Sequence, residues 1–595
     1  MMKNRDYLIP LVSIITIALS SCFHLPNRSS QTSSSNETNT SSDTTSEISQ
    51  SSSSETISTS NISSTEVITS VPSSNTSSSQ SSFISVTSET SSITSQSISS
   101  SHISSTSSSE SPSSITSQIS ITSSSSITSI TSSESIVSSL IASTSQIISS
   151  SQSSSTSEQI IDDYQVIETF SKRMPAEFEP VEMVKMCYPN NMPLSVYKEI
   201  AKDNKILLLV NPDRYDSSRI SEAQTALNNA GVNMDNVTFL DMNIDDDYTY
   251  WVRDFSPFYV FNNLDLGIVD FTYNRDRYEQ NAVPKKLSTY FDMSYSKMDL
   301  VHTGGNLMQD GRGTSFSDDL VVSENSNDKN KVTSQMKQYT GTDNYVITID
   351  PQGDYIAHID CWGKIVAPDK IIVAKLPSSN SRYKYYEQVA NELANTKCAY
   401  GYNYRIYRVE EPGGDTIAPY TNSLIANKHV YVPMGENSYY NQKALEVYQQ
   451  ALPDYSIVGV EGYSFNQSNC FLNTDALHCR SHEVPDKNML FIDSREVLHG
   501  EIEPQAKYLV KTNIVSYANS SVDENDVKIY YSIDDAPYES AHLSRYKDTT
   551  NFIYYFDGLK SGDNVKYYIE AKDASNNKNV DPTNGDKDPH SFSIK

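Results

Sequence analysis

The sequence predicts an α/β domain over residues 165–500, followed by an all-β domain over residues 505–595. In the first region, short apolar runs rich in β-branched residues alternate with amphipathic runs, which is the pattern of strands alternating with helices. In the second region, aromatic-rich runs are separated by turn clusters, and this spacing indicates a small immunoglobulin-like β-sandwich. Its predicted strands are Lys528–Ile533, Phe552–Phe556 and Val565–Ala571.

The elements of the first domain follow from the lengths and periods of its apolar runs. The predicted strands are Lys205–Val210, Val237–Leu240, Gly267–Phe271, Leu320–Val322, Lys370–Ala374 and Val430–Val432. The predicted helices are Asn441–Ala451 and Ser381–Asn395, the latter with an apolar face of Tyr385, Val389, Ala390 and Leu393. No glycine-rich phosphate-binding motif follows any strand, so the sequence does not support nucleotide binding.

Composition and charge limit the folded part and its partners. The 595 residues carry 73 acidic and 45 basic side chains, a net charge of -28, which argues against nucleic acid as the main partner. Residues 51–150 contain 49 serines, no lysine or arginine, and Phe83 as their one aromatic residue, so they cannot form a packed core. We therefore expect residues 22–160 to form a disordered Ser/Thr-rich tether.

The N-terminus has the pattern of an export signal. Lys3 and Arg5 precede an apolar run, Tyr7–Leu19, that is too short to span a bilayer comfortably. The sequence LSSC at residues 19–22 resembles a bacterial lipobox. We expect residues 1–21 to be a lipoprotein signal peptide and Cys22 to carry the lipid, which would anchor the exported protein at the cell surface. An ordinary secretory signal is the alternative.

The cysteine content points to an unpaired thiol. The six cysteines are Cys22, Cys187, Cys361, Cys398, Cys470 and Cys479, and their spacing resembles neither a disulfide framework nor a zinc site. With Cys22 reserved for lipid, five remain, and at least one of them has no disulfide partner. An unpaired thiol in an exported protein is a candidate nucleophile.

Several segments of the first domain combine residue types that suit one reaction. They are YWVRDFSP (250–257), HTGGN (302–306), YIAHIDCWGK (355–364), ALHCRSH (476–482) and the asparagine Asn422. Each one alone is explained as well by packing, a bend or a structural ion pair. Together, a cysteine, a histidine and two aspartates suit nucleophilic attack on a cationic carbon, because the carboxylates bind the cation and the histidine protonates the departing nitrogen.

The motifs W-x-R-D, G-G-N, H-x-D and H-C, in this order, resemble those of the bacterial guanidine deiminases of the pentein superfamily, over about residues 175–500. The resemblance implies a pseudo-symmetric propeller of repeated ββαβ units and a reaction that needs no metal or organic cofactor. It also implies roles for individual residues: Cys479 as the nucleophile, His358 as the general acid and base, Asp254 and Asp360 as the clamp on the guanidinium, and Asn422 as a site residue near the nucleophile.

The same resemblance implies the residues that line the substrate. Trp251 matches an aromatic wall over the guanidinium, Tyr355 a substrate-lining tyrosine, and Thr474 a polar residue before the nucleophile. Arg275 and Arg277 look like the paired arginines with which bacterial peptidylarginine deiminases bind a C-terminal carboxylate. The alternative for this pair is two surface arginines neutralised by the aspartate between them.

Three functions follow from these observations. The leading expectation is a lipid-anchored surface enzyme that converts arginine in peptides or proteins to citrulline, with arginine-containing peptides or proteins as its partners and contact with the membrane only through the lipid. The second is an agmatine deiminase. The third is a surface adhesin that keeps the fold without turnover. Ser256 stands where glycine is common in the motif W-x-R-D-x-G-P, so the motif does not fix the conformation of the turn. The expected chemistry does not depend on that residue.

Overall fold

The computed structural model describes residues 165–189, 192–210, 218–242, 251–277, 279–353, 355–413, 418–462, 471 and 475–595. All of them belong to one compact unit, Ile147–Lys595. The expected signal peptide, the tether, Cys22 and Thr474 lie outside the described residues. In the described part of the chain, no helix is both long enough and apolar enough to cross a membrane.

Four sheets of the first domain repeat one connection. In each, two antiparallel strands are followed by a helix and by a third strand parallel to the second. The repeats are β5 (Phe258–Asn262), β6 (Asp265–Tyr273), α4 (Val283–Tyr290), β7 (Ser294–His302); β8 (Met308–Gln309), β9 (Thr314–Asp318), α6 (Lys329–Thr340), β10 (Asn344–Thr348); β11 (Gly363–Ala367), β12 (Lys370–Lys375), α7 (Tyr383–Ala394), β13 (Arg405–Glu410); and β14 (Leu424–Ala426), β15 (His429–Met434), α8 (Ser438–Ala451), β16 (Ser456–Glu461). The α/β prediction is confirmed.

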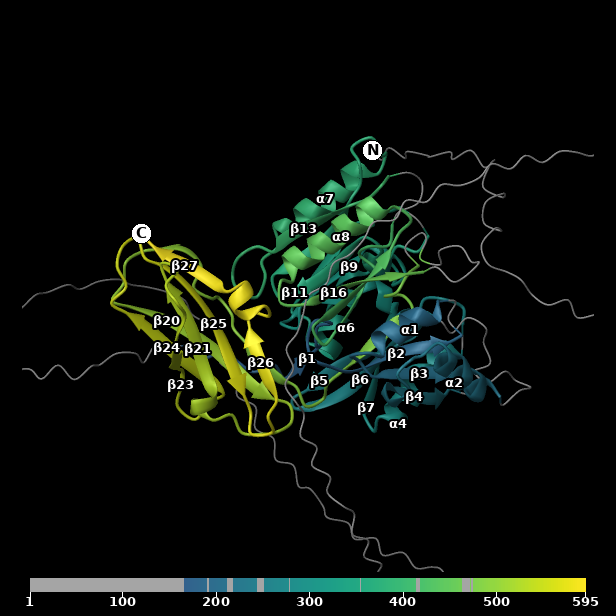
Figure 1. The fold of residues 1–595 in the computed structure, drawn as a ribbon, viewed down its shortest axis with the longest axis horizontal. Helices are drawn as coiled ribbons and strands as arrows, with labels where there is room; N and C mark the ends of the chain where they lie inside the picture. The colour runs from purple at the N-terminus through teal and green to yellow at the C-terminus, as the bar shows by residue number, and fades with distance from the viewer. Residues whose placement is uncertain are drawn as a thin grey trace, which may run out of the picture. The chain divides into compact units, whose positions relative to one another are not determined.

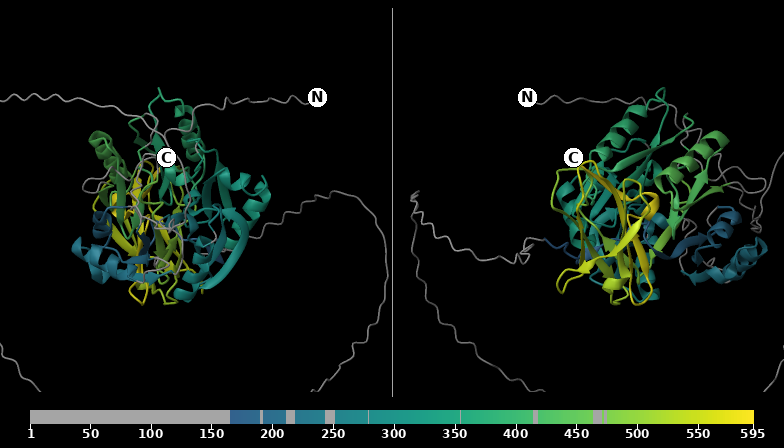
Figure 2. Two further views of the ribbon diagram at one scale, coloured as in Figure 1. Left: turned by 90° about the vertical axis from the view of Figure 1, so that its right-hand side faces the viewer. Right: turned by 60° about the vertical axis from the view of Figure 1, so that its left-hand side comes forward.

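The fifth sheet joins the two ends of the domain. Its members are β17 (Ser481–Pro485), β2 (Val181–Tyr188), β3 (Ile206–Val210) and β4 (Val237–Asp241), with α1 (Leu194–Ile200) and α2 (Arg219–Asn229) between the parallel strands. Strand β17 runs antiparallel to β2, so the chain returns after about 300 residues to complete the sheet that it began. The helices lie on the outer side of the sheets (Figures 1 and 2). This closure brings the segment before β17 against the first strands of the domain.

One predicted strand is wrong. Leu320–Val322 folds as the short helix α5 (Leu320–Ser323) directly after β9. Three apolar residues are too few to show a period of two rather than 3.6. In the structure, the carboxylate of Asp318 accepts a hydrogen bond from the backbone N–H of Leu320 at 3.2 Å, which forms an Asx turn as β9 ends. The other five predicted strands coincide with β3, β4, β6, β12 and β15.

Helix α7 confirms the prediction over 381–395 but presents a different face. Tyr386 is fully buried, together with Val389, Ala390 and Leu393, whereas the expected Tyr385 is 41% exposed. Positions 386, 389, 390 and 393 follow the i, i+3, i+4, i+7 pattern of one helix face. The two adjacent tyrosines could not be ranked from residue type alone.

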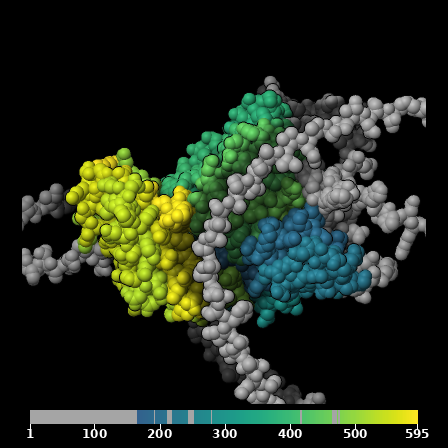
Figure 3. Space-filling model, viewed as in Figure 1, coloured from purple at the N-terminus to yellow at the C-terminus, as the bar shows by residue number. Residues whose placement is uncertain are grey.

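Two sheets with a shared core follow the α/β domain. The first contains β18 (Leu490–Asp493), β20 (Lys507–Ser516), β24 (Asn551–Asp557) and β23 (Ser544–Arg545); the second contains β19 (Gly500–Ile502), β27 (His590–Ile594), β25 (Asn564–Lys572), β21 (Val527–Ile533), β22 (Glu539–His542) and β26 (Lys578–Asp581). Residues of both sheets form one apolar cluster, and Figure 3 shows the outer surface of this region in yellow. The sandwich thus includes a strand before residue 500, and its immunoglobulin-like topology stays a prediction.

Candidate active site

A cavity of about 130 Å³ collects residues from four distant segments of the α/β domain. Its lining contains acidic, basic, aromatic and thiol groups: Trp251, Asp254, Tyr273, Arg275, Arg277, Tyr355, Ile356, His358, Cys361, Asp475 and Cys479. Seven of the ten predicted site residues are among them. Asp360 and Asn422 are fully buried and lie behind the lining, next to Cys479, and Thr474 lies outside the described residues.

Two glycines allow the acidic end of the cavity to close. Asp254 belongs to the one-turn helix α3 (Val252–Phe255), and Gly304 and Gly305 belong to a 3₁₀ turn over 304–306. A Cβ atom on Gly305 would lie 2.5 Å from His358 Nδ1 and 2.8 Å from Asp254 Oδ1, and one on Gly304 would lie 2.1 Å from the carbonyl oxygen of Arg253. Any larger residue here would force these groups apart, so the G-G of HTGGN serves close packing.

His358 and Asp254 are the members of the polar set that line the cavity together with Cys479. His358 Nδ1 lies 3.7 Å from Asp254 Oδ1. Both side chains are buried, and among the described residues neither His358 Nε2 nor Asp254 Oδ1 has a hydrogen-bond partner. Buried polar atoms in native proteins usually have partners, and both residues line the cavity, so they are candidates to contact a polar ligand.

Asn422 holds the nucleophile segment. Its Oδ1 accepts hydrogen bonds from the backbone N–H groups of His478 (2.9 Å) and Cys479 (3.2 Å), and its Nδ2 lies 3.2 Å from Cys479 Sγ. On the other side of the thiol, Asp360 Oδ2 lies 3.7 Å from Sγ. Cys479 is therefore oriented by an amide and faces a carboxylate.

The charges around Cys479 keep its thiol protonated in this state. Burial, followed by the carboxylates of Asp360, Asp254 and Asp475, raises the pKa of Cys479 well above its ordinary value. Burial also raises the pKa of Asp254, although His358 opposes that shift. A cation that enters the cavity would lower all of these pKa values, because it stabilises both the thiolate and the carboxylates.

The lining of the cavity also carries positive charge and aromatic rings. Arg275 and Arg277 are half-buried in the lining, and the guanidinium carbon of Arg277 lies 4.6 Å from the centre of the Trp251 ring. That distance is typical of a cation–π contact. Asp276, between the two arginines, is exposed and does not line the cavity. Tyr355 also lines the cavity and is 84% exposed, so it lies at the mouth.

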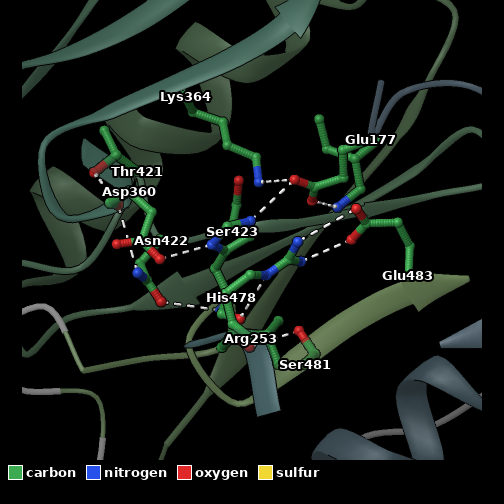
Figure 4. A network of polar contacts seen from close by, with 12 residues as sticks. Glu177, Arg253, Asp360, Lys364, Thr421, Asn422, Ser423, His478, Ser481 and Glu483 are labelled. Carbon is green, nitrogen blue, oxygen red and sulfur yellow. Dashed lines mark hydrogen bonds and ion pairs between the residues drawn. The ribbon is translucent and has the colours of Figure 1, made fainter. Parts of the chain in front are cut away.

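A second polar network, which the motifs did not reveal, lies behind Asp360 (Figure 4). His478 contacts Asp360 and Glu177, and Glu177 also pairs with Lys364. Glu177 and His478 are 301 residues apart in the chain, so no local spacing could connect them. The one available signal was the histidine of the H-C pair, to which the sequence assigned no role.

The described residues do not show the grouping of ligands that a metal site requires. Within the described ranges, no cluster of three or more His, Cys, Asp or Glu side chains is arranged to hold a metal ion. The side chains around Cys479 instead contribute a thiol, an imidazole and carboxylates, which can bind a cation and support covalent attack without further groups.

Comparison with known proteins finds relatives that cover the α/β domain. The model of the family described as "Porphyromonas-type peptidyl-arginine deiminase" matches residues 173–485. A Marinomonas protein named "Putative agmatine deiminase" is 23% identical over 372 residues, 53% of this chain and 95% of that protein; a Lactococcus lactis protein of the same name is 25% identical over 372 residues, with the same shares. The solved agmatine deiminase of Enterococcus faecalis matches with a TM-score of 0.45 and 20% identity, over 54% of this chain and 99% of that one.

Proposed function

Because the chain belongs to the Porphyromonas-type peptidyl-arginine deiminase family, and so is a pentein-superfamily deiminase of guanidino groups, we propose that it converts arginine at the C-terminus of peptides to citrulline and ammonia. One observation carries the peptide part of this proposal: Arg275 and Arg277 line the same cavity as Cys479 and His358. A C-terminal arginine carries a guanidinium at one end and a carboxylate at the other, and this cavity offers acids to the first and arginines to the second.

The two arginines weigh against a substrate with an amine in place of the carboxylate. Agmatine is cationic at both ends, so its amine would meet Arg275 and Arg277. Asp475 also lines the cavity, but it accepts hydrogen bonds from Arg480 at 3.0 and 2.8 Å and is partly neutralised. Agmatine deiminase is nevertheless the second candidate, because the named relatives match over almost their whole length.

The reaction we propose starts with a cation between Asp254 and Asp360. The guanidinium stabilises the Cys479 thiolate as the thiol proton moves to His358. The thiolate adds to the guanidinium carbon, and His358 returns the proton to the departing nitrogen, which leaves as ammonia. The remaining S-alkylthiouronium is attacked by water that His358 deprotonates, and collapse of this adduct releases the ureido product and restores the thiol.

Substrate preference is the test of this proposal. We expect the purified protein to release ammonia from peptides ending in arginine faster than from C-terminally amidated peptides, internal arginine or agmatine. A charge-assisted contact contributes about 1.5–3 kcal/mol, or about 10- to 150-fold in affinity. Changing both Arg275 and Arg277 to alanine should therefore lower kcat/KM for the acid peptide by about that factor, with a smaller loss for its amidated form.

Asp276→Asn is the matched control, since it changes a charge between the two arginines at an exposed position outside the cavity lining. It should preserve the preference for the acid peptide. Equal losses on the acid and amidated peptides in the double variant would show that the arginines do not bind the carboxylate. Faster turnover of agmatine than of any peptide would show that the protein is an agmatine deiminase. If no guanidine is turned over, the remaining hypothesis is a surface adhesin without catalytic activity.

Anchoring at the cell surface is part of the same proposal and rests on residues 1–22. If Cys22 carries the lipid, Cys22→Ala should block processing or release the protein from the membrane fraction, because one residue carries the anchor. Fractionation of cells followed by immunoblotting measures this directly. A variant that remains processed and membrane-bound would contradict the lipobox interpretation and leave export to an ordinary secretory signal.

A further inference from the structure

Asp360 is held from behind by a histidine that contacts a second carboxylate. His478 Nδ1 lies 2.7 Å from Asp360 Oδ2, and His478 Nε2 lies 3.0 Å from Glu177 Oε2. His478 and Asp360 are fully buried, and the side chain of Glu177 is 10% exposed. Glu177 does not line the cavity, and its contact with His478 links it to Asp360.

The two contacts of His478 require two hydrogens. An ionised carboxylate only accepts hydrogen bonds, and a neutral imidazole has a single N–H, so a neutral ring could donate to one acid but not to both. Burial opposes ionisation of Glu177, but Lys364 and His478 outweigh it and hold the pKa of Glu177 below its ordinary range. Burial likewise opposes ionisation of Asp360, and the hydrogen bond and charge of His478 hold its pKa below the ordinary value. With both acids ionised, both hydrogens belong to the ring.

Glu177 is itself fixed in place. Its Oε1 accepts a hydrogen bond from the backbone N–H of Ile425 at 2.8 Å, and its Oε2 also pairs with Lys364. The charged and titratable groups that face this network include Arg253, which is paired with Glu483, together with Lys364, His358, Asp254, Cys479 and Cys361, whose Sγ lies 3.6 Å from Asp360 Oδ1. Glu177 therefore provides a rigid acceptor for His478 Nε2.

We propose that Glu177 is a positioning residue: it holds His478 with hydrogens on both ring nitrogens, and His478 in turn keeps Asp360 ionised and aligned beside Cys479. The proposal deepens the deiminase mechanism and rests on it. Without the second carboxylate, His478 Nε2 would lose its acceptor, and Asp360 would be a buried acid next to the like charge of Asp254. Such an acid takes up a proton more readily and then no longer attracts a guanidinium.

Glu177→Gln tests the charge while preserving the shape. The amide of glutamine can donate to Nε2, which leaves the single N–H of a neutral His478 for Asp360. Because Asp360 loses a cationic neighbour, its pKa should rise, and the acid limb of the pH profile of kcat/KM should move to higher pH. Below the limb, kcat/KM should fall about tenfold for each unit of this shift, and at high pH it should approach that of the wild type.

Lys364→Arg is the matched control, since it changes another partner of the same Glu177 oxygen, keeps the positive charge beside it and leaves both contacts of His478. Its acid limb should not move upward. If both variants lose thermal stability and activity at every pH without any shift of the limb, Glu177 supports the fold only and the proposal is overturned.

Nuclear magnetic resonance of the full chain labelled with ¹⁵N-histidine separates this proposal from the proposed function, because it needs no turnover. The His478 signal is assigned by its loss in His478→Asn. Two protonated ring nitrogens at the pH of the activity assay in the wild type, and one in Glu177→Gln, support the proposal. One protonated nitrogen in the wild type overturns it, whether or not the glutamine variant folds. Absence of turnover of all guanidines together with the expected spectrum overturns only the proposed function.

Discussion

Asp254 and Asp360 are two buried carboxylates that act on the same thiol from opposite electrical surroundings. Burial raises the pKa of Asp254, and its Oδ1 has no hydrogen-bond partner among the described residues. The pKa of Asp360 is held low by His478, with which it forms a hydrogen bond of 2.7 Å. Identical side chains thus differ in their contacts: Asp360 shares a hydrogen bond with His478, whereas Asp254 Oδ1 lies 3.7 Å from His358 Nδ1 without a hydrogen bond.

This difference separates binding from stability. A buried acid without a partner costs folding free energy and gains interaction when a ligand supplies the missing charge. An acid held by a buried histidine contributes to the folded state at all times. The Asp254 side of the site is therefore adapted to the substrate, whereas the Asp360 side is part of the permanent structure.

The thiol between these two sides should give the largest effect. Cys479→Ser should lower kcat at least about 1,000-fold, because a hydroxyl at this position ionises far less than a thiol and forms no comparable covalent intermediate. Citrulline formation and thermal unfolding measure activity and folding separately. Cys398→Ala, at a buried cysteine outside the cavity lining, should remain active. Activity retained by the serine variant would transfer the role to another cysteine, such as Cys361.

Asparagine substitutions at the two aspartates should both lower activity but should change thermal stability differently. Asp254→Asn and Asp360→Asn should each lower kcat/KM by about 30-fold or more, since truncating one partner of a buried charge pair costs roughly 2–5 kcal/mol. At neutral pH, Asp254→Asn should leave the Tm unchanged or raise it, and Asp360→Asn should lower it, because the latter leaves His478 and its neighbours unbalanced. Equal Tm changes would remove the distinction between the two sides.

The pH dependence of stability should differ in the same sense. The folded-state pKa of Asp360 is depressed, so its contribution is present above the ordinary pKa of an aspartate and is lost as pH falls through the folded value. The pKa of Asp254 is raised, so its folded form binds a proton more tightly, and stability declines as pH rises from the ordinary aspartate pKa to the raised one. Between the ordinary and the raised pKa of Asp254, Asp254→Asn should reduce the decline in stability as pH rises. At lower pH, Asp360→Asn should reduce the loss of stability as pH falls.

Sequence reasoning recovered the elements and residues whose signals are local. Buried strands such as β3, ILLLV, are unmistakable, and the H-x-D and H-C pairs each lie within one short segment. The failures occur where a single residue type is ambiguous: Leu320–Val322 is too short to show a period, and Tyr385 and Tyr386 differ in burial but not in kind.

The contacts that distinguish Asp254 from Asp360 could not be predicted from the sequence for a different reason. Glu177 and His478 are brought together only when β17 pairs with β2, which closes the domain. The unequal surroundings of Asp254 and Asp360 follow from that closure and not from either motif. The placement of Arg277 over the ring of Trp251 is likewise tertiary. Residue roles that depend on burial and charge thus required the assembled fold.

The smallest expected effect concerns the reactivity of the thiol itself. Because Asp254 is one of the carboxylates that raise the pKa of Cys479, Asp254→Asn should increase the rate of alkylation of Cys479 by iodoacetamide at pH 7–8. A drop of one unit in the pKa raises the thiolate fraction about tenfold, but the weaker base is about threefold less nucleophilic, so the net gain is about threefold. Asp475→Asn should give a smaller gain, since that carboxylate is paired with Arg480. Mass spectrometry of the alkylated peptide measures the rate, and the Cys479→Ser protein shows the background from other thiols. An unchanged or slower rate in Asp254→Asn would mean that Asp254 is already neutral before substrate binds, and that Asp360 alone suppresses the thiolate.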